Sequence, residues 1–177
     1  MVAMKELILG GVRSGKSGLA ERLARESGLA VTYIATAEAG DAEMRERIRQ
    51  HRQRRPPHWQ LVEADCGLAG VLAAQAAADR CLLVDCLTLW LSRLLAAPEP
   101  ERLAAECDEL LHLLPRLPGR IIMVSNETGL GVVPMGELSR RFCDEAGRLH
   151  QNLSPLCQRV ILTVAGLPQV LKGESLD

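Results

Sequence analysis

Short apolar runs alternate along the chain with segments in which apolar residues recur every three or four positions. The runs have the length of buried strands, whereas the three-to-four spacing is typical of amphipathic helices. Strands are therefore predicted at residues 7–9, 30–35, 59–63, 81–85, 121–124, 160–164 and 169–171. The last of these follows a predicted turn at Gly166, so we expect it to run antiparallel to the strand before it.

Helical spacing follows most of the predicted strands. Helices are predicted at residues 19–24, 41–54, 69–78, 87–95, 103–114 and 138–149. The second of them is strongly basic, with Asp41 as its N-cap and Pro56-Pro57 as its limit. Strands that alternate with helices indicate an α/β fold with a mainly parallel sheet covered on both faces. We expect one domain, residues 1–177, from which the basic helix protrudes.

The composition is that of an ordinary globular protein, with 47% hydrophobic residues, 24% charged residues and a net charge of −1. Neither a transmembrane stretch nor a leader pattern is evident, so we expect a cytoplasmic protein. Aromatic residues make up only 2%, too few for a base-stacking platform, and the balanced charge does not call for nucleic acid. The six scattered cysteines indicate neither a zinc site nor a disulfide framework.

The segment between the first strand and the first helix satisfies the phosphate-loop pattern G-x-x-x-x-G-K-S. In such a loop, backbone N–H groups converge on phosphate oxygens, and the following helix adds positive potential. The lysine reaches the outer phosphates, and the serine hydroxyl can hold Mg²⁺. The predicted nucleotide-binding residues of this loop are Gly10, Gly11, Val12, Arg13, Ser14, Gly15, Lys16 and Ser17.

Asp85 ends a buried-type apolar strand. P-loop proteins place the second acidic partner of the metal at such a strand end, so Asp85 is predicted to support Mg²⁺ near Ser17, across adjacent strand ends. An N-cap for the next helix is an alternative role, and the two roles are compatible.

The basic helix carries a histidine on its apolar side. Met44, Ile48 and His51 share one face, whereas the arginines lie largely elsewhere. Neutral imidazole is a competent nucleophile, and nearby cations favour that form by lowering its pKa. However, histidines on such faces are more often structural, and arginines are often merely solvated. The residues by themselves leave this role open.

Four motifs in order resemble the bifunctional adenosylcobinamide kinase / adenosylcobinamide-phosphate guanylyltransferase family of cobalamin assembly. They span nearly the whole chain. The histidine motif and the Ser-Asn-Glu loop are far more restrictive than the P-loop. The matching residues are Gly10-Gly11-x-Arg13-Ser14-Gly15-Lys16-Ser17, Tyr33-Ile34-Ala35-Thr36, Arg47-Ile48-x-x-His51-x-x-x-Arg55-Pro56-x-x-Trp59 and Ser125-Asn126-Glu127-x-Gly129-x-Gly131-x-x-Pro134.

The resemblance implies a RecA-like P-loop fold, a homotrimer and two reactions. ATP or GTP would phosphorylate adenosylcobinamide, and GMP from GTP would then be transferred to adenosylcobinamide phosphate. A histidine matching His51 carries the GMP in that family, so His51 and Lys16 are the predicted catalytic residues. Arg55 would neutralise phosphate charge, and Glu63 and Glu127 are candidate contacts to guanine, ribose or the metal, with surface or loop-fixing roles as alternatives.

One position departs from the family pattern. The late helix reads Gly147-Arg148-Leu149-His150-Gln151, with histidine where the family has asparagine. We expect His150, like His58 and His112, to be exposed or to serve packing. Two other functions remain as alternatives: a P-loop kinase acting on another small alcohol, and a RecA-like ATPase module.

Overall fold

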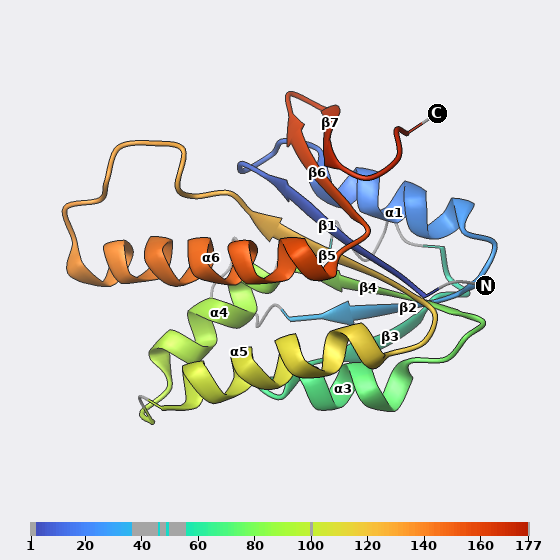
Figure 1. Ribbon diagram of the computed structural model, residues 1–177, viewed down its shortest axis with the longest axis horizontal. Helices are drawn as coiled ribbons and strands as arrows, with labels where there is room; N and C mark the ends of the chain where they lie inside the picture. Colours follow the sequence, from blue (N-terminus) through green and yellow to red (C-terminus); the bar gives the residue numbers. More distant parts are fainter. Residues whose placement is uncertain (1–2, 37–45, 47–48, 50–55, 100, 177) are drawn as a thin grey trace.

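The computed structural model describes residues 3–36, 46, 49, 56–99 and 101–176. Figure 1 shows a twisted sheet with helices on both faces. The strands are β1 (Met4–Gly10), β2 (Ala30–Ala35), β3 (Gln60–Glu63), β4 (Arg80–Asp85), β5 (Arg120–Asn126), β6 (Arg159–Val164) and β7 (Leu167–Lys172). The helices are α1 (Lys16–Glu26), α3 (Leu68–Gln75), α4 (Leu87–Ala96), α5 (Arg102–Leu113) and α6 (Glu137–Leu156), with a 3₁₀ turn, η1 (Leu114–Arg116).

The seven strands lie in the order β3-β2-β4-β5-β1-β6-β7. All neighbouring strands from β3 across the sheet to β6 pair in parallel, whereas β6 and β7 are antiparallel. The predicted mainly parallel sheet and its antiparallel last strand are thus confirmed. The predicted basic helix at 41–54 lies outside the described residues except for Glu46 and Arg49, which are helical and form an ion pair at 2.7 Å.

Two apolar cores lie on opposite faces of the sheet. On one face, α1 packs against residues of the central strands. On the other, α3, α4, α5 and α6 cover a larger core around Trp90, whose indole N–H donates to the Cys66 carbonyl at 2.6 Å. The central strands read as continuous apolar runs because both of their faces are buried. Within the described residues, no helix is long and apolar enough to cross a bilayer.

A buried ion cluster joins three neighbouring strands, β5, β1 and β6, near their amino ends. Glu6 of β1 is completely buried, and its carboxylate accepts from Arg120 of β5 and Arg159 of β6, each at 2.6 Å. Beside it, Lys5 is also buried and donates to the carbonyls of Leu117 and Gly119. The cluster lies at the edge opposite to the phosphate loop, so we assign it to strand register and stability.

Replacing Glu6 by glutamine is expected to lower the free energy of unfolding by about 3 kcal/mol, because two largely buried guanidinium groups lose their counter-charge. Urea unfolding followed by circular dichroism would measure the change. Glu26→Gln is the matched control, since Glu26 forms an exposed pair with Arg22 at 3.9 Å and such pairs contribute little. Equal effects of the two changes would contradict a stabilising role for the cluster.

Candidate active site

The predicted phosphate loop lies at the carboxyl edge of the sheet, between β1 and α1. Arg13 and Gly15 both adopt the left-handed backbone region, with φ of 57° and 96°. Gly10 has no room for a side chain, because an added Cβ would lie 2.6 Å from the Thr163 carbonyl oxygen and would also clash with the Ser14 hydroxyl. The glycines of the motif therefore permit a tight turn that directs the loop toward the start of α1.

Lys16 is the first residue of α1 and is buried. Its Nζ donates to the Gly11 carbonyl at 3.1 Å, which folds the side chain back over the loop. Burial lowers the pKa of Lys16, and the negative charge of Asp85 partly offsets that effect. Ser17 follows at the second helical position and is half-buried. The loop thus collects an ammonium, a hydroxyl and a helix N-terminus, all of which suit phosphate oxygens.

Asp85 ends β4, as predicted, but one part of that prediction is wrong. The strands of Asp85 and of the phosphate loop are not adjacent, because β5 lies between β4 and β1. The charge of Asp85 nevertheless acts on Lys16. Its Oδ2 accepts from the Tyr33 hydroxyl at 2.9 Å. Tyr33 lies on β2, so a neighbouring strand orients this carboxylate; the sequence offered no signal for that pairing.

The strand ends beside Asp85 are tied together by side chains. The Thr36 hydroxyl donates to the Cys86 carbonyl at 2.6 Å and accepts from the Cys86 N–H at 2.8 Å. Arg93 of α4 donates to the carbonyls of Thr36 and Ala64 and forms an ion pair with Asp65. These bonds join the carboxyl ends of β2, β3 and β4, and sequence reasoning did not find them.

Glu63 is the last residue of β3, at the edge of the sheet, and its side chain is exposed. It pairs in register with Ala35 of β2, which in turn pairs with Asp85 of β4. Glu63 and Asp85 therefore lie in one row along the carboxyl edge. Strands are about 4.8 Å apart, so this row can follow an extended nucleotide away from the phosphate loop.

Glu127 begins the long loop that follows β5, and it lies directly beside the phosphate loop. Its N–H donates to the Gly10 carbonyl at 3.0 Å. Its Oε1 accepts from the N–H of Gly129 at 2.6 Å, so the carboxylate also shapes its own loop. Glu127 thus lies beside Lys16 at the carboxyl edge of the sheet, whereas Glu63 lies at the same edge on the outermost strand, β3.

His150 is buried in α6, and its ring faces this loop rather than the apolar core alone. Its Nε2 lies 2.8 Å from the Ser125 hydroxyl, and its Nδ1 lies 3.8 Å from Oε2 of Glu127. Burial lowers the pKa of His150, while the Glu127 charge opposes that effect. The expectation that His150 is merely exposed or packed was therefore incomplete. Its departure from the family pattern was the signal in the sequence.

The remaining predicted site residues, His51 and Arg55, lie outside the described residues. Among the residues that are described, no cluster of three histidine, cysteine or carboxylate side chains suits a metal. A magnesium ion at a nucleotide needs fewer protein ligands, because phosphates and waters supply the rest. The Ser17 hydroxyl and the Asp85 carboxylate are hard oxygen donors of the kind that fits it.

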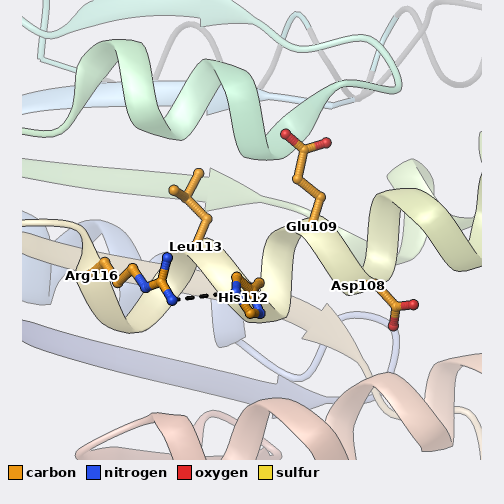
Figure 2. Close-up of a pocket in the computed structure, with 5 residues that line it drawn as sticks. All are labelled: Asp108, Glu109, His112, Leu113 and Arg116. Carbon is orange, nitrogen blue, oxygen red and sulfur yellow. Dashed lines mark hydrogen bonds between the residues drawn. The ribbon is translucent and has the colours of Figure 1, made fainter.

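A surface hollow of about 370 Å³ lies elsewhere, at the end of α5 and the following turn, η1. Figure 2 shows its lining side chains, including His112, whose Nε2 lies 3.3 Å from an Arg116 nitrogen. The chain continues from here into Arg120, the first residue of β5, at the amino edge of the sheet. The hollow is therefore not part of the edge that carries Lys16 and Glu127.

Comparison with known proteins decides the family. Residues 6–171 match the family described as cobinamide kinase / cobinamide phosphate guanyltransferase. The chain belongs to this family. It is 65% identical over 173 residues to the bifunctional adenosylcobalamin biosynthesis protein CobP of Pseudomonas aeruginosa, covering 98% of this chain and all of that one. It is also 36% identical to CobU of Escherichia coli K12, over 96% of this chain and all of CobU.

Membership in the cobinamide kinase / cobinamide phosphate guanyltransferase family makes the chain a bifunctional kinase and guanylyltransferase of cobalamin biosynthesis. Solved structures support the fold. FlaH of Methanocaldococcus jannaschii matches with a TM-score of 0.53 and 15% identity over 97% of this chain and 79% of that one. The RadB recombinase matches with a TM-score of 0.50 and 16% identity over 90% of this chain and 73% of that one. The predicted RecA-like P-loop fold is thus confirmed.

Proposed function

We propose that this enzyme phosphorylates the hydroxyl of adenosylcobinamide with ATP or GTP and then transfers GMP from GTP to the resulting phosphate. The products of the second reaction are adenosylcobinamide-GDP and pyrophosphate. Membership of the family supports a kinase and a guanylyltransferase activity. We infer the named substrates, the residue roles and the covalent intermediate.

The observation that carries the proposed site is the group of Lys16, Asp85 and Glu127 at one edge of the sheet. Lys16 and Asp85 act on each other electrostatically, and Glu127 is bonded to Gly10 of the phosphate loop. Ligands of open α/β sheets bind outside the carboxyl ends of the strands. We therefore assign triphosphate binding to residues 10–17, with Lys16 opposite the developing phosphate charge.

Ser17 and Asp85 would hold Mg²⁺, which neutralises charge on the leaving phosphate oxygens when it is bound. The Tyr33 hydroxyl donates a hydrogen bond to Oδ2 of Asp85 and thereby orients the carboxylate. Lys16 neutralises phosphate charge from the side of α1. The helix N-terminus adds N–H donors at the same place.

His51 is the proposed carrier of GMP, supported by its sequence motif. A neutral ring nitrogen attacks the α-phosphorus of GTP, forming a P–N bond as the P–O bond to pyrophosphate breaks. A phosphate oxygen of adenosylcobinamide phosphate then attacks the same phosphorus, forming the P–O–P link and releasing the imidazole. Arg55 would neutralise charge during both steps, and Glu63 and Glu127 would contact the bound nucleotide.

A homotrimer is part of this proposal. The basic segment at 41–54 is long and charged, and a neighbouring subunit would complete the pocket around it. Chromatography with light scattering would determine the oligomeric state, and a monomer with full activity would contradict this role for a neighbour.

Incubation with α-labelled GTP tests the proposed intermediate. The protein is expected to acquire label that survives alkali and is lost in acid, which is the behaviour of a phosphoramidate. γ-Labelled GTP under the same conditions is the control, and it should leave no such label. A protein that phosphorylates its substrate but never retains the α-label would be a kinase without the proposed carrier.

A further inference from the structure

The ring of His150 connects three parts of the molecule. The residue lies on α6, yet its two ring nitrogens face Ser125 at the end of β5 and Glu127 in the loop that follows. Glu127 is in turn bonded through its N–H to Gly10 of the phosphate loop. A continuous set of contacts therefore runs from the helical layer to the nucleotide edge.

The surroundings of the ring favour one tautomer. Nδ1 lies 3.8 Å from Oε2 of Glu127, which is too long for a direct hydrogen bond, but the negative charge of the carboxylate favours a proton on the nitrogen that faces it. Nε2 is then an acceptor, and the Ser125 hydroxyl donates to it at 2.8 Å. Burial lowers the pKa of His150 and favours this neutral form. The ring is thus anchored to the strand through Nε2 and turns its Nδ1–H dipole toward the Glu127 carboxylate.

We propose that His150 is a positioning residue for catalysis, which acts by holding the Glu127 carboxylate in place beside the phosphate loop. The inference rests on the proposed site at residues 10–17. Within the described part of the chain, two groups act on the Glu127 carboxylate: the Gly129 N–H donates to it at 2.6 Å, and the His150 ring attracts it electrostatically from 3.8 Å. The first is local to a long exposed loop, whereas only the second ties the carboxylate to a helix packed on the core.

The length of the loop makes such a restraint necessary. Residues 127–136 contain no helix or strand, and Val132 and Met135 are 96% exposed. Figure 1 shows this segment extending beyond the end of β5 before α6 begins. Catalytic groups must be held within fractions of an ångström, so a side chain at the base of such a loop needs support from a rigid element.

A double-mutant cycle tests the inference, using steady-state phosphorylation of adenosylcobinamide with ATP. His150→Ala is expected to lower kcat by roughly tenfold, as misplacement of a site group does, with a smaller change in the KM for ATP. In the Glu127→Ala background, the same change should cost less than about twofold, because independent sites add and coupled ones do not. His150→Asn keeps an N–H donor near the position of Nδ1 and should restore most of the loss.

His112→Ala is the matched control, because His112 is an exposed histidine in the hollow of Figure 2, and it should leave the rates unchanged. Thermal melting of every variant checks folding. An equal loss from His150→Ala with and without Glu127 would overturn the inference, as would full activity of His150→Ala. Lys16→Met in the same assay tests the proposed phosphate site separately from the role of His150. If Lys16→Met retains activity, the proposed site at residues 10–17 is itself wrong.

Discussion

Replacement of Lys16 by methionine is expected to lower the rates of both phosphorylation and GMP transfer by about 10²- to 10³-fold, the usual cost of losing a charge-stabilising donor. Methionine keeps the apolar stem that packs at the start of α1 but removes the ammonium. Because burial lowers the pKa of Lys16, the charged form costs free energy in the fold. The variant should therefore be at least as stable as the parent, so the loss of rate is not a loss of folding.

Single-turnover assays with ATP and with GTP would measure both rates, alongside thermal melting. Lys172→Met is the control, since Lys172 donates to helix-end carbonyls of α6 and pairs with Val160 near the amino end of β6, at the edge of the sheet opposite to the phosphate loop. Near-normal rates for Lys16→Met would place the triphosphate elsewhere. A loss confined to one reaction would mean that the two reactions use different phosphate sites.

Replacement of His51 by alanine should abolish GMP transfer, by at least about 10³-fold as expected for loss of a nucleophile, while phosphorylation largely survives. The reason is chemical: only GMP transfer is proposed to pass through a P–N bond, and alanine cannot form one. Covalent label from α-labelled GTP should disappear together with formation of adenosylcobinamide-GDP.

His58→Ala is the control for this change, because His58 is an exposed histidine a short distance along the chain. It should retain labelling and both activities. If His51→Ala reduced the two reactions equally while folding stayed normal, His51 would serve general phosphate binding instead of carrying GMP. Label that persisted in His51→Ala would assign the carrier to another residue.

Much of the fold could be predicted because its signals are local. The apolar run at 81–85 becomes β4, and the helix predicted at 87–95 becomes α4, because buried parallel strands and amphipathic helices have different periods. The limits differ by a few residues: α6 continues to Leu156, through Pro155, beyond the last periodic residue. Proline lacks an N–H donor and its ring crowds the carbonyl four residues earlier, so helices end close to it, as α6 does at Leu156.

The order of the strands was not accessible in this way. Asp85 was expected on a strand adjacent to that of the phosphate loop, but β5 lies between the two. Strand order depends on crossover paths, and local patterns do not encode those paths. The same limit applies to the bond between Tyr33 and Asp85, which joins residues 52 positions apart.

Local sequence determined the phosphate loop, because its glycines, lysine and serine act through backbone conformations and side chains within eight consecutive positions. It also predicted the buried strands that bring Asp85 and Glu127 to one edge. Tertiary structure decided which side chains support them: Tyr33 for Asp85, Arg93 for the ends of β2 and β3, and His150 for Glu127. These partners meet only when strands pair and helices pack on the sheet, since contact between distant segments depends on the three-dimensional register of whole elements.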